Sequence, residues 1–304
     1  MNETKNFQPG ILEPVPAVAR YVNFVIPDAG TDAQAIKEAF ARLSPLANGS
    51  DVVLGIGPSL VQALGAEVPG LHEFPDFSGH GVKVPSTPGT LWCWIRGDDL
   101  GDLLHLTRKV QRALAPAFAI RHVVDAFRHA WSGTHGRDIT GYEDGTENPE
   151  GQAALEAALA QGVGAGVDGS SYVAVQQWLH DLDAFEALTD ELANHSFGRD
   201  RVTNEELEDS PESAHVKRTA QESFDPEAFV LRRSMPWMVS MQAGLMFVAF
   251  GKSLHGFEAQ MRRMAGVDDG IVDALFKISK PVNGSYYWCP PMQGGRLDLR
   301  QLGL

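Results

Sequence analysis

The spacing of apolar residues over roughly the first 130 residues alternates between two periods, and this predicts short strands separated by helices. Runs rich in β-branched and aromatic residues, typical of strands, occupy 20–26, 51–56, 89–96 and 118–131. Two segments between them have the three- and four-residue spacing of amphipathic helices, namely 32–46 and 98–116. In the second helix the apolar face is formed by Leu100, Leu103, Leu104, Val110 and Leu114. The predicted order is therefore β-α-β-β-α-β.

The second half repeats this order loosely, with a charged stretch at 199–227 as an interruption. The pattern predicts strands at 169–179 and 286–288 and helices at 182–192 and 254–264. Between the two helices it predicts a hairpin of two strands, at 239–242 and 244–250. Each half has the order of a ferredoxin-like unit. We therefore expect an α+β chain of two ferredoxin-like domains, each an antiparallel sheet flanked by helices, over 1–150 and 151–304.

The charge of the chain limits the partners that it can have. The 304 residues carry a formal net charge of -14, so nucleic acid and anionic membranes are disfavoured. No stretch approaches the 18 or more uninterrupted apolar residues of a transmembrane helix. The first ten residues lack the basic-then-apolar layout of a secretion signal. We expect a cytoplasmic protein that has no membrane partner.

The two cysteines, Cys93 and Cys289, do not form a C-x-x-C pair. A zinc site or a redox dithiol is therefore not indicated. Cys93 lies within a run that reads as a buried strand. We expect both thiols to be reduced and buried, and nothing in the sequence supports a disulfide between them.

The segment Gly141–Pro149, G-Y-E-D-G-T-E-N-P, combines two glycines, three carboxylates, an asparagine and a proline. Such a run is incompatible with a helix interior or a central strand, because glycine permits positive φ and proline removes a backbone donor. We expect a shaped loop that holds one carboxylate, Asp144, in a defined place. The alternative from composition alone is a surface hairpin with a solvated Asp144.

This segment resembles the G-x-x-D-G signature of the dye-decolourising peroxidases, especially the shorter B-type members. Four further blocks resemble the family in the same order: A-H-V-K-R-T at 214–219, V-L-R-R-S-M-P-W at 230–237, G-L-M-F-V-A-F at 244–250 and K-P-V-N-G-S-Y-Y-W at 280–288. The resemblance covers nearly the whole chain. It implies the duplicated α+β architecture, with the Asp144 loop at the end of the first domain and a haem b, one per chain, in the second.

The resemblance implies a peroxidase. Hydrogen peroxide would oxidise ferric haem to a ferryl species, and small aromatic donors such as phenols or dyes, or Mn²⁺, would reduce it in two steps. A homo-oligomer is implied as well. Some relatives carry a long C-terminal tail that loads them into an encapsulin shell. No such tail is evident after the last predicted strand, so we do not expect encapsulation.

His215 matches the family's iron ligand, and Asp273 matches the carboxylate that partners its other ring nitrogen. Such a partner fixes the tautomer of the histidine and raises its basicity. A carboxylate partner also favours ferric and ferryl iron over ferrous iron. The alternative is that His215, one of ten histidines, is an ordinary solvated or core residue.

Asp144, Arg232 and Ser234 match the residues on the opposite side of the haem. Asp144 would move a proton between the peroxide oxygens, and Arg232 would stabilise the developing negative charge. A nearby arginine is expected to depress the pKa of Asp144 and keep it basic. Strand alternation places Ser234 beside Arg232 and sends Arg233 to the opposite face. The alternative is a plain ion pair between Asp144 and Arg232.

Several other residues are assigned more loosely. Phe247 resembles the aromatic residue over the haem edge, although it also suits an ordinary core. Asn148, Arg137 and Lys217 are candidates for haem propionate contacts, because propionates require cationic and amide donors; Arg137 and Lys217 also suit the surface. Electron-relay stations or core packing are the alternatives for Trp131, Trp178 and Trp237.

Two other functions fit the sequence. One is a haem-handling protein that oxidises porphyrinogen or releases iron from haem. The other is a ferredoxin-like ligand-binding protein without haem. Haem bound without turnover of a phenolic donor would favour the first, and a folded chain that binds little haem would favour the second.

Overall fold

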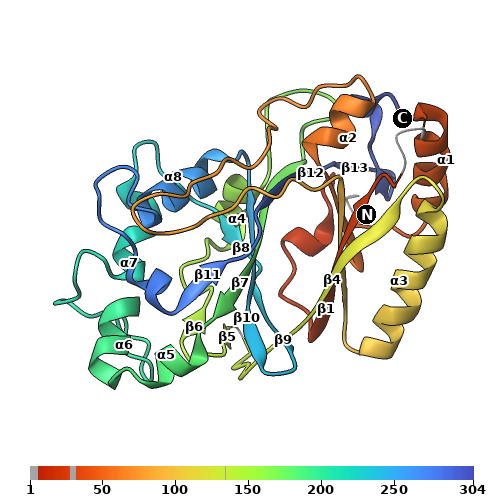
Figure 1. Ribbon diagram of the computed structural model, residues 1–304. Helices are drawn as coiled ribbons and strands as arrows, with labels where there is room; N and C mark the ends of the chain where they lie inside the picture. The colour runs from red at the N-terminus through yellow and green to blue at the C-terminus, as the bar shows by residue number, and fades with distance from the viewer. Residues whose placement is uncertain (1–5, 28–31, 134) are drawn as a thin grey trace.

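A computed structural model describes residues 6–27, 32–133 and 135–304 of the chain. Four strands of the first half are β1 (Val18–Val25), β2 (Val52–Ile56), β3 (Leu91–Gly97) and β4 (Ala119–Phe127). They form an antiparallel sheet in the order β2-β3-β1-β4. Together with α1 (Ala33–Leu43) and α3 (Leu100–Leu114) they confirm the predicted β-α-β-β-α-β order. The two helices lie side by side on the outer face of this sheet (Figure 1).

The apolar face predicted for α3 is partly wrong. Leu100 and Leu104 are 51% and 47% exposed, whereas Leu103, Val110 and Leu114 are buried as expected. Thr107 takes the fourth inward position, where its hydroxyl donates a 2.7 Å hydrogen bond to the Leu103 carbonyl. A buried threonine that satisfies its own hydroxyl in this way is invisible to a search for apolar spacing.

The second half builds a matching sheet from β7 (Ser171–His180), β9 (Met235–Val239), β10 (Gln242–Gly251) and β12 (Ser285–Cys289). Its order, β12-β7-β10-β9, repeats the strand order of the first sheet. The short strands β8 (Leu231–Arg232) and β11 (Ser279–Pro281) extend it beside β10 and β7, and α8 (His255–Met264) packs on its outer face. The two expected ferredoxin-like units are therefore present.

Two element predictions in this half need correction. The single helix expected over 182–192 is two helices, α5 (Leu182–Glu186) and α6 (Asp190–Phe197). The break occurs because the Thr189 side chain accepts from the Leu192 N–H and caps a new helix. The first hairpin strand begins at Met235 rather than 239.

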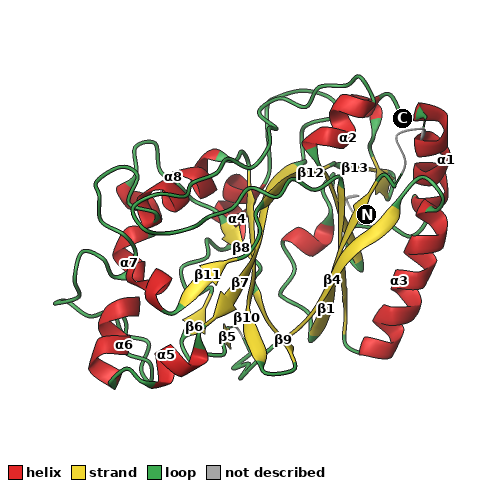
Figure 2. Ribbon diagram, viewed as in Figure 1, coloured by secondary structure: helices red, strands yellow, loops and turns green. Residues whose placement is uncertain are grey.

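The two sheets join edge to edge into a closed barrel (Figure 2). Ala126 of β4 pairs with Trp237 of β9, and Trp288 of β12 pairs with Ile56 of β2. The order β7-β12-β2-β3-β1-β4-β9-β10 then returns to β7. The closed barrel encloses one core shared by both halves, in which four aromatic rings stack in sequence: Trp94, Tyr21, Trp92 and Tyr287.

The remaining elements are short, and several of them position the site. They are η1 (Pro9–Ile11), α2 (Pro58–Ala63), β5 (Gly136–Arg137), β6 (Glu143–Asp144), α4 (Gly151–Ala158), α7 (His215–Arg218), η2 (Gln221–Ser223), η3 (Ala274–Lys277), β13 (Met292–Gln293), β14 (Arg296–Leu297) and η4 (Arg300–Leu302). Cys93 and Cys289 are free and buried, which confirms that prediction. None of the described helices combines the length and apolar character needed to cross a bilayer.

Candidate active site

His215 and Asp273 lie together although 58 residues separate them. His215 is the first residue of α7, and its Nδ1 is 2.8 Å from Oδ2 of Asp273. The carboxylate is 1% exposed, and its other oxygen accepts from the Leu275 N–H at 2.8 Å. The Leu275 N–H therefore holds the Asp273 carboxylate in place independently of its contact with the His215 ring. Because Nδ1 is engaged, Nε2 is the ring nitrogen available to a ligand.

The position of α7 depends on an arginine that the sequence interpretation did not single out. Arg218, at the end of α7, is 4% exposed and donates to both carboxylate oxygens of Asp269 at 2.7 Å. It also donates to the Arg263 carbonyl at the end of α8. The four-residue helix that carries His215 is thus held by a bidentate ion pair between a buried arginine and an exposed carboxylate.

His215 borders two neighbouring cavities. The first, here called the apolar cavity, lies between β7, β10 and α8, and its walls include Trp178, Leu245, Phe247, Met261 and Met264. Alternate residues of β10 face it, while Met246, Val248 and Phe250 point into the barrel core. The second, the polar cavity, is bordered by the Asp144 loop and by Arg199. His215, Thr219 and Arg232 line both cavities, so the two are adjacent spaces around one histidine.

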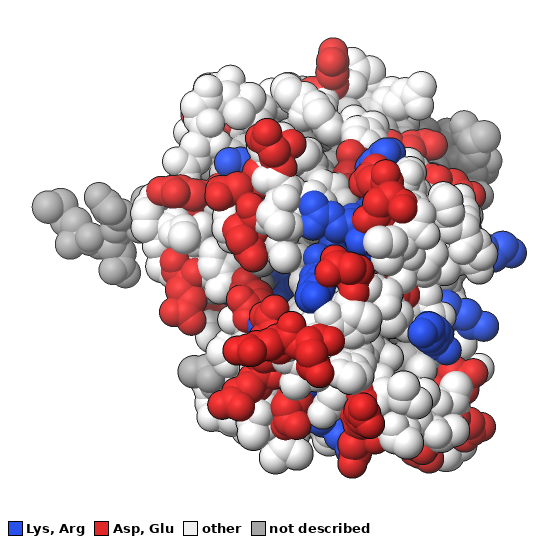
Figure 3. All heavy atoms as spheres, turned by 90° about the vertical axis from the view of Figure 1, so that its left-hand side faces the viewer, with Lys and Arg blue, Asp and Glu red and all other residues white. Residues whose placement is uncertain are grey.

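The polar cavity opens toward an acidic surface. Glu147, Glu206 and Glu222 line it and are exposed. Figure 3 shows that Asp and Glu crowd this face of the molecule, with a few Lys and Arg near its centre. Arg199 binds the carboxylates of Glu147 and Glu206. The sequence interpretation missed Arg199, because it treated the charged stretch only as an interruption of the repeat.

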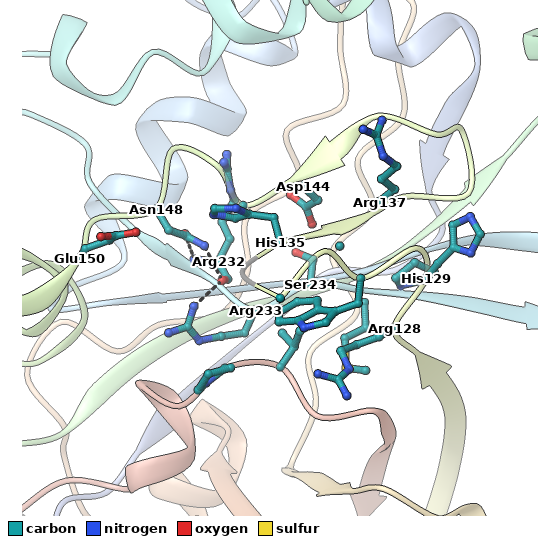
Figure 4. A pocket seen from close by; sticks show the side chains of 18 of the residues that line it. Arg128, His129, His135, Arg137, Asp144, Asn148, Glu150, Arg232, Arg233 and Ser234 are labelled. Atoms are coloured by element: carbon teal, nitrogen blue, oxygen red, sulfur yellow. Dashed lines mark hydrogen bonds between the residues drawn. The ribbon is translucent and has the colours of Figure 1, made fainter. Parts of the chain in front are cut away.

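Asp144 lies in β6, which pairs with β5 in a short hairpin. Gly141 and Gly145, on either side of β6, have φ of 88° and 86°. These are left-handed values that favour glycine, so the segment is the shaped loop that the sequence predicts. Asp144 borders the polar cavity and also a third space, the basic cavity, of about 450 Å³ (Figure 4).

The basic cavity concentrates cationic side chains in an otherwise acidic protein. Its lining contains four arginines and two histidines against two carboxylates: Arg128, Arg137, Arg232, Arg233, His129, His135, Asp144 and Glu150. Trp131 also lines it, with the Arg128 guanidinium 4.8 Å from the ring centroid. The other two tryptophans named as relay candidates are buried in the core. Trp178 also borders the apolar cavity, and Trp237 lies in the barrel core.

Burial controls the charge of Asp144. Loss of water raises the pKa of this carboxyl above its ordinary value, and the nearby Arg232 opposes the rise without cancelling it. Arg232 therefore lowers the pKa of Asp144 as expected, but burial outweighs this effect and the net direction is upward. No ion pair within 4 Å joins Asp144 to Arg232 in the part of the chain that the structure describes. The two side chains face a common space instead of forming a closed pair.

Asn148 holds the main chain of Arg232. Its Oδ1 accepts from the Arg232 N–H at 2.7 Å, and its Nδ2 donates to the Arg232 carbonyl at 3.0 Å (Figure 4). Asn148 lines neither cavity beside His215. It lines the basic cavity instead, and its assignment as a propionate contact stays a prediction. Its role in the structure is to orient Arg232, whose buried Nε has no partner in the described chain.

Ser234 lies beside Arg232 on the basic cavity, as strand alternation predicts. Arg233 lines the same cavity instead of facing away from it, because residues 233–234 lie between β8 and β9 and outside both strands. Arg233 donates to the carbonyls of Ile11 and Leu12, on the N-terminal segment. Ser234 borders the basic cavity with Asp144 and Arg232. Its Oγ also accepts from the Val248 N–H at 3.3 Å.

Two cations expected at propionates are engaged elsewhere. Arg137 donates to the carbonyls of Gly141 and Arg201, both at 2.6 Å, and to Glu143 at 2.9 Å. Lys217 donates to the Ser210 carbonyl at 2.6 Å and borders none of the three cavities. Arg137 therefore shapes the Asp144 hairpin and Lys217 fastens a loop. Both propionate assignments stay predictions.

Comparison with known proteins identifies the arrangement. A family model described as Dyp-type peroxidase, C-terminal, matches residues 135–294, and its N-terminal counterpart matches 47–128. A dye-decolorizing peroxidase of Rhodococcus erythropolis is 30% identical over 297 residues, which cover 92% of this chain and 85% of that protein. The chain belongs to the dye-decolourising peroxidase family. It is accordingly a peroxidase, as the resemblance of its motifs implies.

Solved structures of the dye-decolourising peroxidase family agree with this fold. A DypB variant of Rhodococcus jostii RHA1, solved in complex with haem, superposes with a TM-score of 0.83 at 27% identity and covers 92% of this chain and 94% of its own. A Dyp-type peroxidase from Shewanella oneidensis gives a TM-score of 0.85 at 25% identity, with 99% and 98% covered. The B-type assignment and the boundary at residue 150 stay predictions. The two family models meet between residues 128 and 135.

Proposed function

We propose that this peroxidase binds one haem b per chain in the apolar and polar cavities, with His215 as the residue that would ligate its iron. The observation that carries the proposal is the arrangement around these cavities. A histidine with a buried carboxylate on Nδ1 borders the same space as Arg232, and Asp144 borders the polar part of that space. A redox-active iron porphyrin is what such a histidine would hold.

The residues present fit a haem. The apolar cavity offers flat and flexible apolar side chains, among them Phe247, Met261 and Met264, to the faces of a porphyrin. The buried Nε of Arg232 lacks a partner, which is a cost that an anionic ligand would remove. On the polar side, Arg199 already binds Glu147 and Glu206, so a propionate there would have to displace one of these carboxylates. Bound haem supplies the iron that exchanges electrons with hydrogen peroxide and with the donors.

The protein side chains then divide the remaining tasks. Asp273 fixes the tautomer of His215 and raises its basicity through the 2.8 Å hydrogen bond. Asp144, when deprotonated, takes a proton from one peroxide oxygen and returns it to the other. Arg232 stabilises negative charge on the departing oxygen, and Ser234 adds a hydroxyl beside them.

The two openings differ in charge. Peroxide is small and neutral, and the basic cavity gives it a route to Asp144. The acidic rim of the polar cavity favours neutral or cationic electron donors at the opening of that cavity. Phenols and dyes are the proposed donors. A homo-oligomer, a cytoplasmic location and the absence of an encapsulin shell are predictions that carry over from the sequence.

Titration of the purified chain with haem, followed by absorbance and then by peroxide with a phenolic donor, tests the proposal. We expect one haem per chain, a Soret band typical of histidine ligation, and donor oxidation that requires peroxide. One haem per chain without donor oxidation would replace the proposal with the haem-handling alternative. A folded chain that binds no haem would contradict it altogether.

The pH dependence of peroxide reduction should report Asp144. Because its pKa is raised, the carboxylate form is lost as pH falls through a value above the ordinary pKa of about 3.9 for aspartate. We expect kcat/KM for peroxide to be high above that pKa and to decline below it. In stopped-flow measurements between pH 3 and 8, the wild type should show this decline at low pH, here called the acid limb, and Asp144→Asn should lack it. An unchanged acid limb in the variant would assign the titration to another group.

Asn148→Ala should impair catalysis without touching a ligand. The change removes both hydrogen bonds to the Arg232 main chain, which together contribute on the order of 1–3 kcal/mol. We expect kcat/KM for peroxide to fall roughly tenfold, since Arg232 is no longer held in place. The control is Gln152→Ala on α4, which removes an exposed bond to Glu156. Equal rates for both variants would show that Asn148 does not orient Arg232.

A further inference from the structure

Four buried or partly buried side chains form a hydrogen-bonded chain outside the groups used so far. Oδ2 of Asp138 accepts from the Thr140 N–H at 3.0 Å and from its hydroxyl at 2.6 Å. Oδ1 of Asp138 is 3.1 Å from Nε2 of His180, and Nδ1 of that ring is 2.7 Å from Oγ of Ser279. The side chains of His180 and Asp138 are only 6% and 12% exposed. Both ring nitrogens and both carboxylate oxygens are therefore engaged.

One end of this chain shapes the hairpin that carries Asp144. Asp138 follows β5 directly, and its main chain closes the turn, because its N–H donates to the Tyr142 carbonyl and its carbonyl accepts from the Gly141 N–H. Its carboxylate closes the turn a second time through Thr140. Asp144 stands two residues beyond Tyr142. Asp138 is therefore linked to Asp144 through one turn and two residues of β6.

The other end reaches the segment that supports His215. His180 is the last residue of β7, and it pairs with Ser279, the first residue of β11. The segment before β11 is η3, which is capped by Asp273, the partner of His215. Both His180 and Ser279 border the apolar cavity. One hydrogen-bonded chain thus connects the Asp144 hairpin to Ser279, which follows the end of η3 at Lys277 by two residues.

We propose that Asp138 and His180 are positioning residues that hold the Asp144 hairpin against β7 and β11 and set the field in which Asp144 works. The inference deepens the proposed function, since it rests on Asp144 as the proton acceptor. Asp138 borders none of the three cavities around the site, so it acts through the hairpin and through its charge.

The charges around Asp144 make it possible to test whether Asp138 sets the field in which Asp144 works. Three groups on different elements act on it: Arg232 of β8 and His215 of α7 lower the pKa of Asp144, and Asp138 raises it. The His180 ring keeps Asp138 itself in its charged form, because its hydrogen bond lowers the pKa of that buried carboxyl. Neutralising Asp138 removes one of the two causes that raise the pKa of Asp144.

The first measurement is amide hydrogen exchange over the 136–146 segment of the haem-free chain, which does not depend on any catalytic role. Asp138→Asn replaces one acceptor oxygen with an NH2 donor, so the bond to His180 survives only if the imidazole takes the tautomer that accepts at Nε2. Ser279→Ala removes only the far end of the chain. The matched control, Ser285→Ala on β12, removes an equally buried serine that donates to the Thr87 carbonyl at 2.6 Å.

We expect exchange in the segment to accelerate roughly tenfold in Asp138→Asn and severalfold in Ser279→Ala, with the control unchanged, since opening becomes easier when the tether is cut. The second measurement is the acid limb of kcat/KM for peroxide. It should move to lower pH in Asp138→Asn and stay in place in Ser279→Ala, which changes no charge.

The outcomes separate cleanly. Unchanged exchange in both variants would overturn the tether, and faster exchange with an unmoved acid limb in Asp138→Asn would overturn the link to Asp144. If Asp138→Asn does not fold, Ser279→Ala decides the tether alone. If peroxide is not reduced by the wild type, the proposed function fails, and the exchange result still stands.

Discussion

His215→Ala should leave the chain folded and remove axial ligation of haem. The imidazole is 27% exposed and borders two cavities, so its loss opens space without disturbing the barrel core. Loss of a second-sphere partner of a metal ligand typically costs 10–100-fold in affinity or activity, and loss of the ligand itself should cost more. We expect peroxidase turnover to fall by more than about a hundredfold, and the Soret band to lose its histidine-ligated character.

Two controls sharpen the His215→Ala experiment. His195→Ala removes a partly buried histidine of α6 that lies 3.6 Å from Asp209 and borders none of the three cavities around the site. It should bind haem and turn over like the wild type. Asp273→Asn should retain ligation and lose activity in the 10–100-fold range. If the His215 and His195 variants give the same spectrum as the wild type, another residue ligates the iron.

Asp144→Asn should separate activity from stability. Without the carboxylate there is no proton acceptor at this place, and general acid–base groups typically contribute 10²–10⁴-fold. We expect the rate of the peroxide reaction to fall by about that factor. Asparagine also removes a charge that burial disfavours, and a carboxyl whose folded-state pKa is raised weakens folding at neutral pH. The Tm at pH 7 should therefore stay level or rise.

A second carboxylate on the same cavity provides the control for Asp144→Asn. Glu150 borders the basic cavity and is exposed, so Glu150→Gln removes one negative charge there without removing the proposed acceptor. It should change the peroxide rate by less than about twofold. A similar loss in both variants would mean that the field of the cavity, rather than a proton transfer through Asp144, controls the reaction. A drop in Tm for Asp144→Asn would indicate a structural role.

Sequence interpretation worked where the chemistry of a residue depends on its own surroundings in the chain. Gly141 and Gly145 predicted a shaped loop, and both have positive φ. The order of strands and helices followed from apolar spacing, and the motif blocks led to the family. The structure also brings His215 to Asp273. That pairing came from the resemblance, because nothing in the intervening residues implies it.

The features of the site that the sequence did not reveal depend on contacts between distant residues. Asn148 is a sound amide donor by type, but its partner is the main chain of Arg232, 84 residues away. The pKa of Asp144 was judged from one neighbouring charge, whereas burial by several segments decides its direction. Arg218, whose buried guanidinium pairs with Asp269, could have been suspected only as one more basic residue in the block that contains His215.

The closed barrel gives the four-stranded sheet of the first half a second role besides lining the basic cavity: it supports the sheet that borders the apolar cavity. The sheet that forms one wall of the apolar cavity has its other face on the shared aromatic core, and β2 and β4 from the first half border both of its edges. Neither sheet has a free edge where the two meet, and free edges invite pairing with other chains. In this duplicated fold, the sheet of the first half therefore supports both edges of the sheet that lies beside His215.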